Sequence, residues 1–211
     1  MVPSSKDGLR SSASKRVVQP LTPKDIVNLG LGKITSSFIT SLSPPSTPLE
    51  KRASAGYAHW RNSELAKRRW AFAWRTMTLT QSPMADADED EYEYRYTLPD
   101  SVGRVMRGKR QIFQIRDGYL YSNDSPLRVA YIAAVSETEF DPLFIDVVAC
   151  RVAKEMMRSV PLDVNRGESI EKEYKDAIRT AGVANAFLLP DELHGQEDYE
   201  DDWVIAREIG W

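Results

Sequence analysis

The sequence predicts an α+β protein: a four-helix bundle that carries a small antiparallel β sub-domain between its second and third helices, with extended N- and C-terminal arms. Apolar residues recur with helical spacing in residues 20–80 and again in 139–186, which predicts the bundle. In residues 91–135 the period changes to two, which is typical of half-buried strands. Residues 1–19 and 187–211 lie outside these patterned parts and are expected to form the arms.

The first two helices share one start signal. Each begins with a threonine that can cap the helix, a proline in the first helical position and an acidic residue that completes a capping box. The six residues are Thr22, Pro23 and Asp25, and Thr47, Pro48 and Glu50. Gly30 and Gly32 are expected to shorten the first helix to about three turns. The second helix is expected to run from Pro48 to about Phe72, with basic residues in its last turns.

The third helix has the clearest start, because Asp141 can cap it and Pro142 takes the first helical position. Its apolar stripe consists of Phe144, Val147, Val148, Val152 and Met156. Pro161 is expected to end it. The fourth helix is expected over residues 167–184, and one of its faces carries Ile170, Tyr174, Ala177, Ile178 and Ala181.

The β sub-domain is predicted from alternation and from one turn signal. Between residues 91 and 98, apolar residues share one parity and polar residues the other. The apolar ones are Tyr92, Tyr94, Tyr96 and Leu98. Asp117-Gly118 stands between two strand-like runs, which is a β-hairpin signal, and residues 127–133 predict a further strand. We expect about four or five strands, preceded by an acidic loop over residues 81–91.

The two arms differ in charge. Residues 1–19 are rich in Ser, Lys and Arg and have no hydrophobic period, which predicts a mobile basic arm that either stays solvated or contacts nucleic acid or an acidic neighbour. Residues 187–211 form an acidic tail in which Glu197–Asp202 precedes Trp203 and Trp211. Two tryptophans beyond the last helix are costly to leave in water. They are expected either to pack on the subunit's own helices or to dock on a partner.

Composition argues against several classes of protein. Lys and Arg number 28 and Asp and Glu 31, a formal net charge of −3, whereas a dedicated nucleic-acid binder is usually strongly basic. Cys150 is the single cysteine, so no disulfide can form within the chain, and we expect it to be a buried small hydrophobic residue. No apolar run approaches the ~20 residues that span a bilayer, and no secretory signal is visible. We therefore expect assembly in a cytoplasm and no membrane partner.

No motif in the sequence points to catalysis. His59 and His194 are the two histidines, and with one cysteine they leave no zinc spacing and little basis for a triad. Gly30–Ile34 resembles a phosphate loop only faintly, because the Ser or Thr after the lysine is missing. The cap and the helix dipole explain the carboxylates around the third helix start, which are Glu139, Asp141 and Asp146. We expect no enzyme, no cofactor and no metal site.

Basic and aromatic residues interleave between Arg61 and Arg75. Nucleic-acid bases stack on aromatic side chains, so this segment is a candidate binding face. However, Trp70-Ala71-Phe72-Ala73 lies where the helix must turn into the core. Core packing with a solvated basic face is therefore the favoured interpretation, and a nucleic-acid-binding regulator that uses the Arg61–Arg75 face remains an alternative.

Four stretches in a fixed order give the chain a resemblance to a known family. The first is a short helix followed by Ile34-Thr35-Ser36 and the capped start at Thr47, and the second is the basic-aromatic helix ending in Trp70-Ala71-Phe72-Ala73. The third is Tyr96-Thr97-Leu98-Pro99-Asp100 followed by Arg104-Val105. The fourth is Phe140-Asp141-Pro142-Leu143-Phe144, followed by a helix with Glu173-Tyr174. Together they extend over residues 21–184. In this order the chain resembles the tail tubular protein A family, the head-to-tail adaptors (connectors) of short-tailed bacteriophages.

The resemblance implies a structural virion protein of the phage tail, located at the portal vertex. Such adaptors form a homo-oligomeric ring, typically dodecameric, between the portal protein and the tail nozzle, in some cases near tail fibres. DNA passes through the central channel without sequence-specific binding. Under this interpretation four residues of the tail are expected to contribute to portal or intersubunit contacts, namely Tyr199, Trp203, Ile205 and Trp211.

A second alternative is a virion-associated cell-wall hydrolase. Carboxylates are plentiful, so composition leaves a glutamate-based hydrolase open. The feature that would support it is a pair of carboxylates in a cleft, one of them with a raised pKa.

Overall fold

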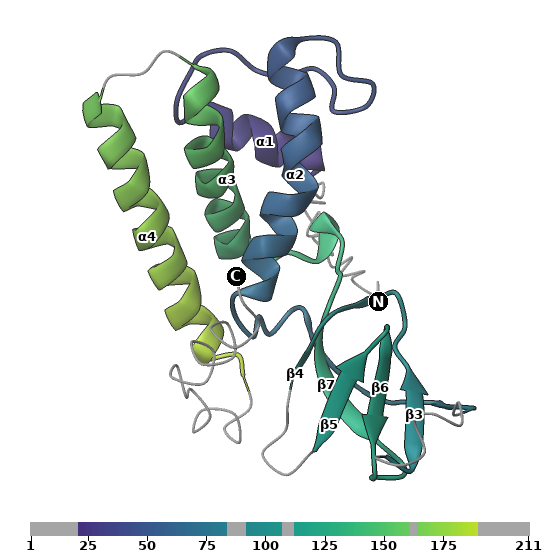
Figure 1. Cartoon of the computed structure of the whole chain (residues 1–211). Coiled ribbons are helices and arrows are strands. Elements are labelled where there is room, and N and C mark those ends of the chain that lie inside the picture. The colour runs from purple at the N-terminus through teal and green to yellow at the C-terminus, as the bar shows by residue number, and fades with distance from the viewer. Residues whose placement is uncertain (1–20, 84–91, 107–111, 161–163, 190–211) are drawn as a thin grey trace, which may run out of the picture.

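The computed structural model describes residues 21–83, 92–106, 112–160 and 164–189 (Figure 1). Within these residues the protein is mixed α+β, with four α-helices and two small antiparallel sheets, so the predicted fold class is confirmed at this level. All the strands of these residues lie between the second and third helices along the chain. In Figure 1 the helices lie side by side at one end of the molecule and the strands lie at the other.

Helices α1 (Pro23–Leu31) and α2 (Pro48–Ala66) begin where the sequence predicts. The side chain of Thr22 accepts a hydrogen bond from the Asp25 amide, and the Asp25 carboxylate accepts one from the Thr22 amide, which completes the capping box. Thr47 and Glu50 form the same reciprocal pair at the start of α2. Each capping box is formed within four residues, so it does not depend on what the helix packs against.

The predicted end of α2 at Phe72 is wrong, because the helix stops at Ala66. The chain then turns, and the indole nitrogen of Trp70 donates a hydrogen bond of 3.0 Å to the Glu64 carbonyl while the ring is buried. Strand β1 (Trp74–Thr78) follows directly. Its aromatic and β-branched residues suit a strand, and it pairs antiparallel with β7 (Arg128–Ala133), which supplies the backbone partners that a longer helix would have supplied internally.

Strand β1 therefore lies inside residues 20–80, the range predicted to be helical. Strand β2 (Gln81–Ser82) lies inside the predicted acidic loop 81–91. Both corrections have one cause. The partners of these short strands lie elsewhere in the sequence, so no local pattern marks them.

The two sheets have seven strands in the described residues. Five of them, β3 to β7, lie within residues 91–135, where four or five were expected, and β1 and β2 precede that range. One sheet has the order β1-β7-β4, and the other has the order β2-β3-β6-β5. The remaining strands are β3 (Tyr94–Thr97), β4 (Val102–Met106), β5 (Phe113–Arg116) and β6 (Tyr119–Ser122). Asp117 and Gly118 have φ of 51° and 79°, as a type I′ hairpin turn requires, so the predicted hairpin is confirmed.

Helix α3 (Pro142–Met156) is the central helix, since it contacts α1, α2 and α4 (Val164–Ala186). The Asp141 carboxylate accepts a hydrogen bond of 2.9 Å from the Leu143 amide, so the predicted cap is confirmed. Short 3-10 turns, η2 (Glu137–Glu139) and η3 (Met157–Ser159), flank the helix. Helix α4 extends slightly beyond the predicted 167–184 at both ends. Pro161, the predicted helix stop, lies outside the described residues.

Gly30 marks the closest approach of α1 to α3. A Cβ atom at this position would lie 2.6 Å from the Ala149 carbonyl oxygen and 2.8 Å from Cβ of Val152. The glycine is therefore required by helix packing, which the sequence alone did not indicate.

Buried apolar residues form two separate clusters. The larger one joins the four helices, the turn after α2 and the ends of β7. The smaller one lies in the sheets and consists of Leu79, Tyr96, Phe113, Leu120, Leu127 and Val129. The sheets thus have a hydrophobic cluster of their own.

Candidate functional site

The predicted contact residues of the tail lie outside the described residues. This holds for Tyr199, Trp203, Ile205 and Trp211, and also for the basic arm and His194. Their roles therefore stay predictions. The candidate site in the described part is the surface at the end of α4, where the tail begins.

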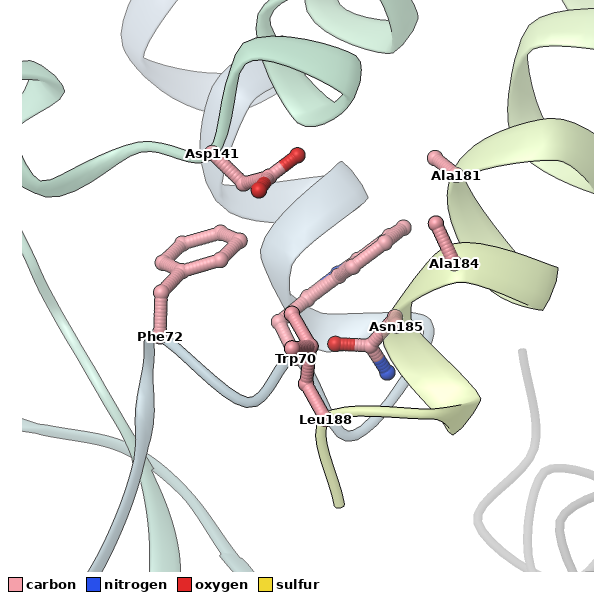
Figure 2. Close-up of a pocket in the computed structure, with 7 residues that line it drawn as sticks. All are labelled: Trp70, Phe72, Asp141, Ala181, Ala184, Asn185 and Leu188. Atoms are coloured by element: carbon pink, nitrogen blue, oxygen red, sulfur yellow. The ribbon is translucent and has the colours of Figure 1, made fainter.

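A small pocket lies beside the end of α4 (Figure 2). It is lined by Trp70, Phe72, Asp141, Ala181, Ala184, Asn185 and Leu188. Asn185 holds one wall in place, because its amide nitrogen donates a hydrogen bond of 2.8 Å to the Arg69 carbonyl and its amide oxygen accepts one of 2.7 Å from the Ala71 amide. One carboxylate oxygen of Asp141 is engaged in the α3 cap. The lining is therefore mainly aromatic and aliphatic.

Apolar side chains next to this pocket are open to solvent. Phe187 is 83% exposed, Leu188 65% and Val183 58%. Val183 lies in the last turn of α4, and Phe187 follows the helix directly. Neighbouring exposed apolar side chains of this size are typical of a contact surface.

Three basic residues of the Arg61–Arg75 segment, Arg61, Lys67 and Arg75, form ion pairs with carboxylates of the same chain. Arg61 lies 2.8 Å from Glu137, and Arg75 lies 3.3 Å from Glu139. Among the aromatic residues of the segment, Phe72 and Trp74 are partly buried against the hydrophobic core, and Trp70 at the turn is 2% exposed; Trp60, just before the segment, is 8% exposed. The structure therefore places these aromatic side chains in or against the core, as the favoured interpretation expected, and gives no support to a stacking face here.

Glu64 is a buried charge that the sequence analysis missed. Its carboxylate accepts hydrogen bonds from Tyr174 Oη at 2.9 Å and from Lys67 Nζ at 2.7 Å, and Arg151 Nε lies 3.8 Å away. These partners come from α4, from the end of α2 and from α3. A buried carboxylate that is paired in this way holds elements together. No sequence signal distinguishes Glu64 from the exposed acids of α2, since its partners are distant along the chain.

Glu50 anchors the loop between α1 and α2. Its Oε1 accepts hydrogen bonds from the amide and hydroxyl of Thr40 and from the Ser41 amide, and its Oε2 accepts from the amide and hydroxyl of Ser46 and from the Thr47 amide. These donors, the Ser46 hydroxyl first, hold the pKa of Glu50 well below its usual range. A hydrolase acid needs the opposite shift. Glu50 therefore acts as a loop anchor.

The remaining reactive residue types have ordinary surroundings. Cys150 is 3% exposed, as expected, and burial raises the pKa of its thiol, which suppresses the reactive thiolate. His59 is exposed on α2. Among the described residues no group of three His, Cys, Asp or Glu side chains could hold a metal ion. In the same part of the chain, no helix has the length and apolarity to cross a membrane.

A scan of known protein families and a search of curated proteins both find no match to this chain. A functional proposal therefore rests on the motifs and on the geometry described above. The surface at the end of α4 and the aromatic turn beside it are the two features that bear on it most directly.

Proposed function

We propose that the protein is a structural virion component, a head-to-tail adaptor that forms a ring, expected to be dodecameric, between the portal protein and the tail nozzle. DNA passes through the channel of this ring. The proposal comes from the ordered resemblance of four stretches to the tail tubular protein A family. The positions of those stretches in the folded chain support the proposal.

One observation carries most weight: the second and fourth stretches, far apart in sequence, meet in a single aromatic cluster. The ring centroids of Trp70 and Phe144 are 4.8 Å apart, and those of Phe72 and Phe144 are 5.1 Å apart. Phe140 packs edge-on against Phe144 at 4.9 Å. This cluster lies where the chain passes between helices and sheets. The residues that carry the resemblance thus serve to hold the two parts of the subunit together, which suits a structural protein.

The proposal includes the finer architecture, a four-helix bundle with an inserted β sub-domain. Contacts of α3 with the other three helices support the bundle, and the separate hydrophobic cluster of the sheets supports the sub-domain. A ring built by head-to-tail contacts needs two different complementary surfaces on each subunit. A helical part and a β part provide two such surfaces.

The tail is proposed as a docking arm for the portal or for a neighbouring subunit. Its first residues, Phe187 and Leu188, are exposed, so the described start of the tail belongs to an apolar contact surface. Deleting residues 203–211 is expected to weaken assembly while the subunit stays folded.

Electron microscopy of the full chain, alone and with the portal protein of its phage, tests the proposal. Rings on the portal are expected. The double variant W203A/W211A should assemble less well, whereas F38A, which removes an aromatic ring that is 60% exposed on the loop after α1, should assemble normally. Absence of any ring with the full chain would overturn the adaptor. Normal assembly of W203A/W211A would overturn only the role of the tail.

A further inference from the structure

One face of the four-stranded sheet carries arginine and tyrosine side chains beside Thr97 and Gln114. Side chains alternate across a strand, so residues paired in register share a face. Arg95 in β3 is paired with Tyr121 in β6, and Arg116 in β5 is paired with Tyr119 in β6. We call this set, together with Tyr92, the Arg-Tyr face. The opposite side of the same sheet carries the buried cluster around Tyr96 and Leu120.

The arginines of the Arg-Tyr face lie over the tyrosine rings diagonally across the strands. Cζ of Arg95 is 4.5 Å from the centroid of Tyr119. Cζ of Arg116 is 5.2 Å from that of Tyr121 and 5.7 Å from that of Tyr92. Cation–π attraction of this kind holds a guanidinium in a defined position, while the N–H groups around its edge can still donate. The guanidinium groups of this face are therefore held in defined positions.

Arg95 has unused donor capacity. Its Nε is buried and has no hydrogen-bond partner among the described residues, and within that part of the chain its guanidinium forms no ion pair. Its Nη2 donates a hydrogen bond to the carbonyl of Pro83. A guanidinium fork is best matched by a carboxylate, which it can bind through two parallel hydrogen bonds.

We propose that the Arg-Tyr face binds the acidic segment Glu197–Asp202 of a neighbouring copy of the chain. This inference rests on the proposed ring. Five of the six residues of the segment are carboxylates. The segment starts eight residues after Leu189, so it can reach roughly 25 Å beyond the last described residue. A basic face and an acidic segment on one chain are two different complementary surfaces, as a head-to-tail contact requires.

The tyrosines argue for an acidic peptide over single-stranded nucleic acid. Bases bind by stacking on open aromatic faces. Tyr121 is 3% exposed, since Arg116 and Tyr92 lie against it. The rings therefore serve to position the guanidinium groups, which are the groups that recognise carboxylates.

Binding of a synthetic peptide of residues 190–211 to the full chain tests the contact. We expect R95Q/R116Q to weaken peptide binding about tenfold, the effect of losing roughly 1.4 kcal/mol, and added salt to weaken binding to the unsubstituted chain. The matched control is K51Q/K172Q, which removes the same charge from exposed lysines on α2 and α4. Thermal unfolding by circular dichroism identifies any variant that fails to fold. Equal binding to R95Q/R116Q and to the control would overturn the inference, as would displacement of the peptide by an oligothymidine.

A mixing experiment tests whether the contact joins two copies. R95Q/R116Q retains the acidic segment, and D198N/E200Q/D201N/D202N retains the Arg-Tyr face. Each variant alone should sediment as a monomer, and the mixture should give a one-to-one dimer. Failure of the mixture to associate would overturn the contact between copies. If the unsubstituted chain and R95Q/R116Q form rings equally well, the inference fails and the proposed adaptor stands. If the peptide binds the Arg-Tyr face but the unsubstituted chain forms no rings, the proposed adaptor fails.

Discussion

The hydroxyl of Tyr174 in α4 donates a hydrogen bond of 2.9 Å to the carboxylate of Glu64 in α2, where both side chains are buried. Lys67 Nζ contacts both groups, at 2.7 Å from the carboxylate and 2.5 Å from the hydroxyl. Arg151 approaches the same carboxylate from α3. A single buried charge thus links three helices, and its removal should destabilise the whole helical part.

Glu64→Ala is expected to lower the free energy of unfolding by about 2–3 kcal/mol, because the charged partners and Tyr174 lose their acceptor. Tyr174→Phe should cost about 1 kcal/mol, since one hydrogen bond is lost and the ring remains. Urea unfolding followed by tryptophan fluorescence measures both. Glu168→Ala, at an exposed position of α4, is the control and should change stability by less than about 0.5 kcal/mol. Equal effects of Glu64→Ala and the control would show that the carboxylate holds nothing together.

Gly30→Ala is expected to destabilise the protein by about 1–3 kcal/mol, because the added methyl group must displace α3 backbone and Val152. Gly167→Ala is the matched control. Its Cβ would meet only Met157 Cε, at 3.6 Å, and alanine favours the helix by about 0.5–1 kcal/mol. The two substitutions should therefore have opposite signs in the same thermal or urea measurement. A stabilising Gly30→Ala would contradict the close packing of α1 on α3.

The lowered pKa of Glu50 predicts that the stability of the fold depends on pH. Its pKa is lowered in the folded protein, so it stabilises the fold above the unfolded value of 4.5, and this contribution is lost as pH falls from there toward the folded pKa. Glu50→Gln should be less stable than the unsubstituted protein at neutral pH. The difference in urea midpoint should shrink as pH is lowered through about 4 and 3. Glu168→Gln should follow the unsubstituted protein throughout, and a constant gap for Glu50→Gln would contradict the assigned cause.

Asn185→Ala is expected to loosen the end of α4, because it removes both hydrogen bonds to the turn at Arg69 and Ala71. A loss of about 1–2 kcal/mol is expected. Hydrogen exchange should speed up most in residues 183–189, beside the pocket of Figure 2, and much less in α1. Thr180→Ala, at an exposed position of the same helix, should leave exchange there unchanged. Uniform acceleration in both helices would instead indicate global destabilisation.

Much of the fold could be predicted because its signals are local. Thr22, Thr47 and Asp141 each bond to an amide two or three residues ahead, so their helix starts are encoded within one turn. Asp117-Gly118 encodes its hairpin in two residues through their positive φ. The burial of Cys150 follows in the same way from the apolar run around it, and the burial of Trp70 follows from its place where the chain turns into the core.

The candidate site could be predicted only in part. Trp70, Phe72 and Asp141 were noted as a core turn and a helix cap, but nothing in the sequence placed them together with Asn185 and Leu188 around one pocket. The tail residues proposed for docking remain predictions from the sequence. Arg95 and Arg116 carried no signal of their own, because each becomes part of a face only through its pairing with β6.

The sequence by itself therefore determined the α+β class, the helix starts and the hairpin turn, since these depend on interactions within a few residues. The tertiary structure alone decided that α2 ends at Ala66, that β4 pairs with β7, and that Glu64 and the Arg-Tyr face find their partners. The physical reason is common to all of them. Each depends on backbone pairing, burial or charge contacts between residues far apart along the chain, and such contacts exist only once the chain has folded.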